Sequence, residues 1–439
     1  MISSIAYMIF TPYGIMALSY NSMGIMLLLS ACVILATAKK HSGLQWFAAG
    51  ILFAGAVLCC PYLVVLYAAF TLAAILLRRK YKRLPQIWLM VTAGCGILLL
   101  VFCWVLFSRT SLRDVIRVFP ELFNDPDHPN IPLWKKTLGY FSSILFSSKA
   151  FLPCFLTAVI VTVYSKLRKK PELGLVIMCA LIAVMMLSSL LETHYLNHVM
   201  FPINLIAPYC ALHSRKREIR LPFWSIWIPG AIYSYCICLS SNQAFYAISS
   251  AGTVMTVASI VMLAGFLPTL DPARSKTLLR RTVCAAAALL LGLQILSELA
   301  LRYYSVYWER MGLQYETVLA ESGPDKGILM TPERFADYTT WEADMARIRD
   351  DDEIRQLLVI SDNTHLYLSA QKDMSTYSAW LSSMSDASLS RLDAYFSLFP
   401  EKAPDAIYIE APFVRYAEHY MSQGYRCEQL DSGGCLLKK

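Results

Sequence analysis

The chain contains 439 residues, of which 56% are hydrophobic and 16% are charged, and its mean hydropathy is +0.47. Because an ordinary water-soluble domain carries roughly 25% charged residues, this composition excludes a chain that is soluble throughout. Residues 1–300 hold 25 Lys and Arg against 9 Asp and Glu, whereas residues 301–439 hold 14 against 22, which indicates a basic membrane part followed by an acidic aqueous part.

Long apolar segments follow one another through residues 1–301. A hydrocarbon core of about 30 Å is crossed by roughly 20 apolar residues in a helix, and the sequence predicts about eleven such spans. They lie near residues 2–18, 21–38, 44–60, 61–77, 86–107, 143–164, 173–191, 196–213, 222–240, 244–267 and 281–300. This pattern predicts an α-helical polytopic membrane protein, with a tight hairpin of two short helices at Cys60-Pro61.

Five basic clusters separate these predicted spans. They are Lys39 and Lys40; Arg78, Arg79, Lys80, Lys82 and Arg83; Lys166, Arg168, Lys169 and Lys170; Arg215, Lys216, Arg217 and Arg220; and Arg274, Lys276, Arg280 and Arg281. If the amino terminus is cytoplasmic and every span crosses, all five clusters lie on the cytoplasmic side, where lysine and arginine concentrate. We therefore expect a multi-pass protein of the cell membrane whose loop 108–142 and residues 302–439 are extracytoplasmic.

The predicted outer loop 108–142 is basic although it lies on the outer side. Arg109, Arg113 and Arg117 are spaced i, i+4, i+8, so on a helix they form one cationic stripe. Lys135 and Lys136 follow near the end of the loop. The stripe fits a clamp for the phosphate of a lipid or lipid-linked sugar, since one guanidinium group can donate two parallel hydrogen bonds to phosphate oxygens. An interfacial helix lying on anionic head groups is the alternative.

Candidates for acid–base chemistry lie in the same loop. Asp125-Pro126-Asp127-His128 places two carboxylates and an imidazole in a proline-bounded turn at the membrane surface. Either carboxylate is suited to act as a base on a hydroxyl group, and two of these groups together are suited to hold a cation. A solvated turn without chemistry is the alternative interpretation.

A second polar cluster lies between two predicted spans on the outer side. It contains Glu192, His194, Tyr195 and His198. Ionisable groups at this depth usually face a cavity or a polar partner, and His194, Tyr195 and His198 are therefore candidate ligands for the same phosphate. An interfacial turn with Tyr195 in the aromatic belt is the alternative.

Residues 302–439 alternate short apolar runs with turns, as expected for an α/β domain. The expected order is a helix at Pro332–Arg349, a strand at Leu357–Ile360, a helix at Asp386–Phe399, a strand at Ala406–Ile409, a helix at Pro412–Met421, and a final pair at Tyr425–Leu430 and Cys435–Leu437. The domain carries none of the common nucleotide-binding or hydrolase motifs. A lid or partner-binding module is the simplest interpretation, and a disulfide between Cys427 and Cys435 is left open.

Several short segments together resemble a known family. They are Ser19-Tyr20-Asn21; residues 49–55, which run into Cys60-Pro61; Asp127-His128-Pro129; His194-Tyr195-Leu196 ahead of Pro202; and residues 402–409. The arrangement resembles the GT-C superfamily of membrane glycosyltransferases, in particular members similar to mannosyl- and arabinosyl-transferases. The first basic residue is Lys39, so the chain lacks a basic signal-peptide start, and we expect the first spans of the family to be absent.

The resemblance implies transfer of a hexose or pentose from a polyprenyl-phosphate donor to an extracytoplasmic acceptor during synthesis of cell-envelope glycans. The family's catalytic aspartate lies in a first outer loop that has no counterpart here. Asp125, Asp127 and His128 are therefore the remaining candidates for the base. No resident cofactor and no nucleic-acid partner are expected, a divalent metal is left open, and the partners are the lipid bilayer and the lipid-linked sugar.

Two other functions remain open at this stage. A chain without the catalytic loop would instead be an inactive relative, serving as a non-catalytic scaffold or assembly protein of glycan synthesis. A transporter normally shows broken or polar helices near the membrane midplane and often an internal repeat, and the sequence contains no such repeat.

Overall fold

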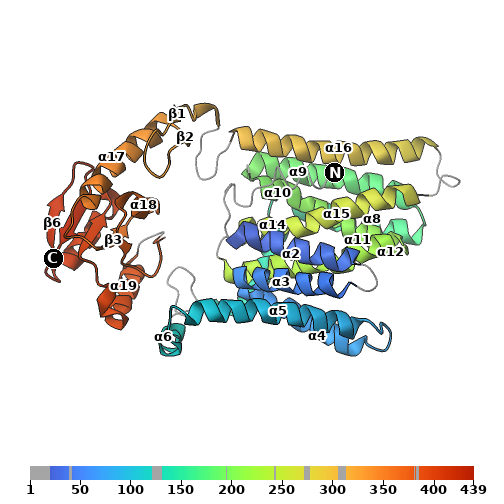
Figure 1. The fold of residues 1–439 in the computed structure, drawn as a ribbon. Helices are drawn as coiled ribbons and strands as arrows, with labels where there is room; N and C mark the ends of the chain where they lie inside the picture. Colours follow the sequence, from blue (N-terminus) through green and yellow to red (C-terminus); the bar gives the residue numbers. More distant parts are fainter. Residues whose placement is uncertain are drawn as a thin grey trace. The chain divides into compact units, whose positions relative to one another are not determined.

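The computed structural model describes residues 20–38, 42–120, 131–193, 195–241, 244–270, 277–304, 313–379, 381 and 385–439. These residues form two compact units, a helical unit that extends to Tyr304 and an α/β unit that begins at Leu313 (Figure 1). The chain is thus mostly helical and carries a small sheet near its carboxyl end.

The helical unit is built from the following elements. They are α2 (Tyr20–Thr37), α3 (Gly43–Cys59), η2 (Pro61–Leu63), α4 (Val64–Leu76), α5 (Leu84–Phe107), α6 (Leu112–Val118), α7 (Leu133–Leu145), α8 (Phe151–Leu167) and α9 (Pro171–Thr193). They continue with α10 (Leu196–Met200), η4 (Phe201–Leu205), α11 (Ile206–His213), α12 (Arg217–Pro222), the π-helix η5 (Phe223–Trp227), α13 (Ile228–Ser240), α14 (Ala244–Ala251), α15 (Thr253–Phe266), η6 (Leu267–Thr269) and α16 (Thr277–Tyr304).

Fewer helices than expected are long and apolar enough to cross a membrane. Within the described residues, four continuous helical stretches qualify, or five if the bent pair α14 and α15 counts as one span. They are Tyr20–Thr37, Leu84–Phe107, Pro171–Thr193 and Arg217–Ser240, with Ala244–Ala251 plus Thr253–Thr269 as the bent pair. The prediction of about eleven spans is corrected accordingly, while several membrane-length apolar helices are confirmed.

Short and interrupted helices account for the difference. Apolar helices such as Gly43–Cys59 and Phe151–Leu167 stop short of 18 residues. The predicted span 143–164 is divided, because α7 ends at Leu145 and α8 begins at Phe151. The predicted span 196–213 is divided by the 3-10 helix that contains Pro202, since proline removes a backbone donor from the helix. The first predicted span, 2–18, lies outside the described residues.

Helices α3 and α5 approach each other so closely that only glycine fits at their crossing. A Cβ atom on Gly50 would lie 2.1 Å from the carbonyl oxygen of Val91, and one on Gly94 would lie 2.1 Å from that of Phe47. The Cys95 thiol donates to the Gly50 carbonyl at 3.2 Å. This backbone-to-backbone contact is the usual way that helices associate where no hydrophobic driving force acts between them.

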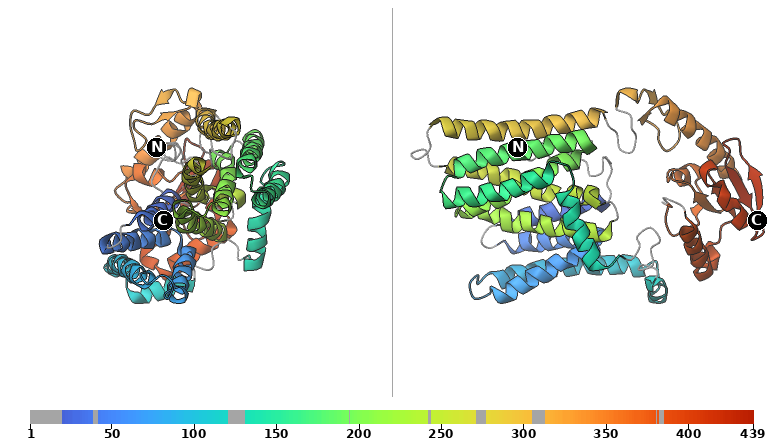
Figure 2. Two further views of the ribbon diagram at one scale, coloured as in Figure 1. Left: turned by 90° about the vertical axis from the view of Figure 1, so that its right-hand side faces the viewer. Right: turned by 180° about the vertical axis from the view of Figure 1, so that it is seen from behind.

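The basic turns gather at one end of the helical unit. Ser165 and His213 form a hydrogen bond at 2.9 Å, and the Lys166 amine donates to the Leu212 carbonyl, so the turns after α8 and α11 are neighbours. The α4–α5 turn lies at the same end, whereas α6 and the start of α14 lie at the opposite end (Figures 1 and 2). The described basic clusters therefore share one face, as the distribution of charge in the sequence predicts.

The α/β unit contains a five-stranded mixed sheet in the order β4-β3-β5-β7-β6. Strands β4, β3 and β5 are parallel, and β7 and β6 are antiparallel to their neighbours. The strands are β3 (Gln356–Ile360), β4 (Asp373–Met374), β5 (Ala406–Ile409), β6 (Arg426–Gln429) and β7 (Cys435–Lys438), and a separate hairpin joins β1 (Val318–Leu319) to β2 (Leu329–Met330). The other elements are η7 (Leu313–Tyr315), α17 (Pro332–Arg349), α18 (Leu366–Ala370), α19 (Asp386–Leu398), η8 (Pro400–Lys402), η9 (Ala411–Tyr416) and α20 (Ala417–Met421).

Alternating side chains of β3 and β5 build a core on each face of this sheet. Leu358 and Ile407 belong to the core with α19 and α20, whereas Leu357 and Tyr408 belong to the core with α17 and α18. The predicted helix Pro332–Arg349 begins as expected, because the Thr331 hydroxyl accepts from the Arg334 amide at 3.2 Å. Both cysteines of the disulfide left open earlier are free thiols.

Candidate functional site

The three arginines of the outer loop do not form one helical stripe. Helix α6 begins only at Leu112, after a capping box in which the Ser111 hydroxyl accepts from the Asp114 amide at 3.1 Å. Arg113 and Arg117 lie on α6, while Arg109 precedes the cap, and all three side chains are exposed. The stripe of three is corrected to a pair on α6 with a third arginine beside it.

The same helix also exposes an apolar surface. Leu112 and Ile116 of α6 and its C-cap residue Phe119 are solvent-accessible, and no residue of α6 is buried. Exposed apolar and cationic groups on one short helix are typical of a segment that lies at a membrane interface. An exposed pair of guanidinium groups beside apolar side chains is compatible with both interpretations of this loop.

The two lysines predicted to bind the same phosphate have different surroundings. The Lys136 amine donates to the carbonyl of Leu239 at 2.5 Å, in the last turn of α13, and Thr137 and Tyr235 share a hydrogen bond at 2.7 Å. Lys136 therefore caps a carbonyl group at the carboxyl end of α13, where the helix dipole favours a cation. Lys135 stays exposed, with its amine 5.5 Å from the Trp134 ring centroid.

His198 is enclosed by aromatic rings. Its side chain is 7% exposed, and its ring centroid lies 5.2 Å from that of Tyr195, 4.6 Å from Phe245 and 5.9 Å from Tyr246. Within the described part of the chain, neither imidazole nitrogen has a hydrogen-bond partner. His198 is thus buried rather than displayed at the surface, and its predicted role in phosphate binding stays a prediction. Tyr195 is half exposed beside it.

Four further candidates lie outside the described residues. They are Asp125, Asp127, His128 and His194. The structure therefore brings the caged Tyr195–His198 pair together and places Arg113 and Arg117 on one helix, and these are two distinct clusters built from different elements.

A polar seam that the sequence analysis missed runs between α10–η4 and α14–α15. The Asn197 amide donates to the Tyr246 carbonyl at 2.9 Å and to the hydroxyls of Ser249 and Ser250 at 2.9 and 3.0 Å. The Thr256 hydroxyl donates to the side-chain oxygen of Asn204 at 2.9 Å. These side chains are neutral, so a search for charges inside spans did not find them.

The helices that carry this seam are both interrupted. Helix α10 passes into the 3-10 helix η4 at Phe201, and the pair α14 and α15 bends by 44°. At the bend, a Cβ atom on Gly252 would lie 2.9 Å from the Phe201 ring. Broken, polar helices are the feature that the transporter hypothesis requires. They also occur in membrane enzymes wherever irregular backbone is buried within protein.

A cleft at the end opposite the basic turns was likewise not predicted. It has a volume of about 340 Å³ and lies between the α7–α8 turn and the end of α9. Its polar lining consists of Ser148, Lys149 and Glu192. The sequence signal was the polar interruption Ser147-Ser148-Lys149 inside an apolar segment, which the expected span 143–164 passed over.

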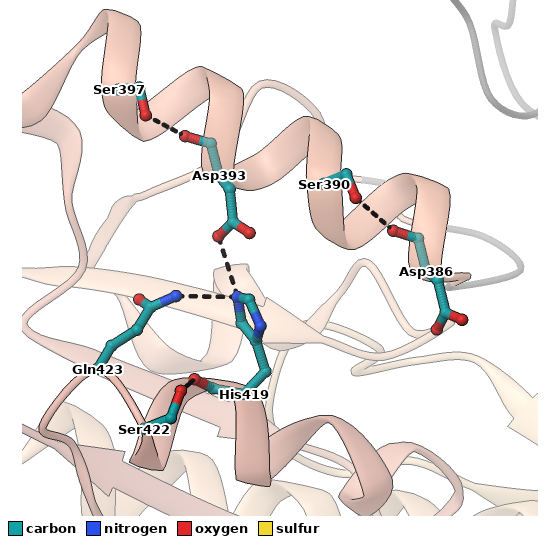
Figure 3. A network of polar contacts seen from close by, with 7 residues as sticks. All are labelled: Asp386, Ser390, Asp393, Ser397, His419, Ser422 and Gln423. Atoms are coloured by element: carbon teal, nitrogen blue, oxygen red, sulfur yellow. Dashed lines mark hydrogen bonds and ion pairs between the residues drawn. The ribbon is translucent and has the colours of Figure 1, made fainter.

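In the α/β unit, a histidine–carboxylate pair links α19 to α20 (Figure 3). The His419 Nε2 atom lies 3.1 Å from Asp393 Oδ1 and 2.9 Å from the Gln423 amide nitrogen. Three nearby serine hydroxyls donate to carbonyl groups of their own helices: Ser390, Ser397 and Ser422. The His419–Asp393 contact ties α19 to α20.

The carboxyl ends of β3 and β5 form another polar group. Parallel sheets commonly bind ligands there, where connections leave neighbouring strands in opposite directions. Here the Ser361 hydroxyl donates to Glu410 at 2.5 Å, and the Asn363 amide lies 3.4 Å from both oxygens of that carboxylate. Ser361, Asn363 and Glu410 therefore form a polar cluster whose members bond to each other at the carboxyl ends of β3 and β5.

Comparisons with protein-family models, with curated proteins and with solved structures return no match to this chain.

Proposed function

We propose that the chain is a membrane glycosyltransferase of the GT-C type, which moves a sugar from a polyprenyl-phosphate donor to an acceptor on the extracytoplasmic side. The observation that carries this proposal is the pair of exposed arginines on α6, at the end of the helical unit opposite the basic turns. Guanidinium groups at the level of lipid head groups are suited to hold the donor phosphate and to stabilise it as it leaves.

The orientation belongs to the same proposal. The described basic turns share one end of the helical unit, and lysine and arginine concentrate on the cytoplasmic side of membrane proteins. With that end inside, α6, the cleft and the α9–α10 turn are extracytoplasmic. Helix α16 runs from the basic end to Tyr304. If it crosses the membrane, the α/β unit belongs to the same outer compartment, and this assignment is part of the proposal.

Binding of a polyprenyl phosphate to the full chain in nanodiscs tests the arginine site. The double variant Arg113→Gln, Arg117→Gln is expected to weaken binding about tenfold or more, because each charge-assisted hydrogen bond to phosphate contributes roughly 1.5–3 kcal/mol. The matched control is Arg78→Gln, Arg79→Gln, two exposed arginines of the opposite end. Equal binding by the two double variants would refute the phosphate site on α6.

A non-catalytic scaffold is the second candidate, and two placements favour it. Lys136 bonds to α13 and His198 is enclosed by rings, so two of the predicted phosphate ligands serve packing. Transfer of mannose or arabinose from its polyprenyl phosphate to a glycan acceptor by the purified full chain discriminates the two functions. Turnover excludes the scaffold, and binding without turnover excludes the enzyme.

A further inference from the structure

The cleft at the α7–α8 turn combines an apolar wall with opposite charges. Phe146, Leu152 and Pro153 supply apolar lining, and Ser148, Lys149 and Glu192 supply polar lining. Phe146 is 70% exposed. The volume of about 340 Å³ is at the small end of the range for small-molecule sites, so it suits a head group rather than a whole lipid.

Lys149 and Glu192 attract each other electrostatically, but no direct ion pair joins their described side chains. The Glu192 carboxylate accepts from the backbone amide of Lys149, at 3.2 and 3.3 Å, and from the Ser188 hydroxyl at 2.5 Å. Within the described residues, the Lys149 ammonium forms no ion pair of its own. Because a carboxylate offers about four acceptor positions, Glu192 retains capacity for a further donor.

Ser148 supplies an independent sign of a missing partner. Its side chain is 5% exposed, and its hydroxyl has no hydrogen-bond partner among the described residues. A buried hydroxyl left without a partner destabilises the fold, whereas one that donates to a bound oxygen does not. The cleft thus presents an ammonium donor and a carboxylate acceptor around one volume, and a hydroxyl without a described partner is buried in its wall.

We propose that this cleft binds the head group of a zwitterionic phospholipid bearing a primary ammonium. The lipid phosphate accepts from Lys149, its ammonium donates to Glu192, and its chains leave over Phe146. An anionic lipid satisfies Lys149 but leaves Glu192 facing a negative charge. A ligand that carries both charges pairs with both Lys149 and Glu192. The apolar lining residues favour binding of a lipid over binding of free phosphoethanolamine.

Competition between lipids on the full chain tests this proposal. Native mass spectrometry of protein from mixed nanodiscs of phosphatidylethanolamine and phosphatidylglycerol is expected to retain the ethanolamine lipid about tenfold more strongly. Glu192→Gln keeps an oxygen for the Lys149 amide but removes the charge, so it abolishes this preference. Lys149→Met reduces retention of both lipids. The controls, Glu172→Gln and Lys170→Met, lie at the other end of α9 and leave the preference unchanged.

Two results would overturn the proposal. One is equal or stronger retention of phosphatidylglycerol by the unmodified chain, and the other is an unchanged preference in Glu192→Gln. Thermal unfolding of each variant verifies that the fold is kept, and soluble phosphoethanolamine added as a competitor separates head-group binding from lipid binding. Because polyprenyl-phosphate binding by α6 is measured separately, this proposal and the proposed function can fail independently.

Discussion

The crossing of α3 and α5 allows a stability prediction that depends on backbone geometry alone. In Gly50→Ala the new Cβ would lie 2.1 Å from the Val91 carbonyl oxygen, 2.9 Å from its carbonyl carbon and 3.0 Å from its Cα. An ordinary carbon–oxygen contact is about 3.3 Å or longer, and backbone atoms cannot rotate away as a side chain does. The two helices must therefore move apart by about 1 Å.

That movement weakens the contact along its whole length. Overpacking of this kind typically destabilises a protein by about 1–3 kcal/mol, and separation also lengthens the hydrogen bond from Cys95 to Gly50, now 3.2 Å. Gly94→Ala meets the Phe47 carbonyl oxygen at the same 2.1 Å and is expected to destabilise by a similar amount. Since one separation of the helices relieves both clashes, the double variant should lose less stability than the two single losses added together.

Gly96→Ala provides the control on α5, the helix that carries Gly94, because a Cβ on Gly96 has nothing within 4 Å. Alanine is favoured over glycine in a helix by up to about 1 kcal/mol, so this variant should be neutral or slightly stabilising. Thermal unfolding of the full chain in detergent, followed by circular dichroism, orders the variants. Equal midpoints for Gly50→Ala and Gly96→Ala, or strict additivity in the double variant, would refute the argument.

Three further predictions concern the α/β unit. Burial lowers the pKa of the His365 imidazole, so protonation favours the unfolded chain. The stability of the α/β unit should therefore fall as the pH drops below about 6.5. Hydrogen exchange of β3 measures this loss, which should be smaller in His365→Phe. Burial raises the pKa of the Asp344 carboxyl, so this group gives stability the opposite pH dependence and destabilises the fold when it is ionised. At pH 7, Asp344→Asn should therefore be at least as resistant to proteolysis as the unmodified chain. This advantage should shrink towards pH 4, where Asp344 becomes protonated. Gly323 has φ +76°, and a Cβ there would lie 2.1 Å from the Tyr338 hydroxyl. Gly323→Ala should therefore destabilise the β1–β2 hairpin by about 1–3 kcal/mol. Hydrogen exchange at β1 and β2 should be faster than in the control Gly327→Ala, where φ is also positive but a Cβ has nothing within 4 Å.

Local signals predicted the α/β unit well. The helix Pro332–Arg349 is specified by Thr331, Pro332 and Glu333 at its start, all within one turn. The strand at Ala406–Ile409 is an apolar run that is buried on both faces of the sheet, and its observed bounds are those expected. Such elements need no information from distant residues, so a sequence is enough to place them.

The helical unit was predicted less well because its breaks depend on tertiary contacts. The bend at Gly252 is made against the ring of Phe201, about fifty residues earlier in the chain. Lys136 finds its acceptor at Leu239, 103 residues away. In an apolar segment, the sequence pattern indicates only that a side chain is compatible with lipid. It does not indicate which distant residue packs against that side chain. The surroundings of Lys136 and His198 belong to this class, because distant residues form them.

The same breaks determine where chemistry is available. In a membrane helix every backbone group is bonded within the helix, so polar partners appear where a helix stops or bends. The α7–α8 turn exposes Lys149 in this way, while α6 begins at a capping box made by Ser111 and Asp114, and Arg113 and Arg117 take no part in that cap. The arginine pair lies on a helix of its own, whereas the cleft is built from α7, α8 and α9. A change at Glu192 therefore leaves the arginine pair intact, which is why the two binding experiments report on separate sites.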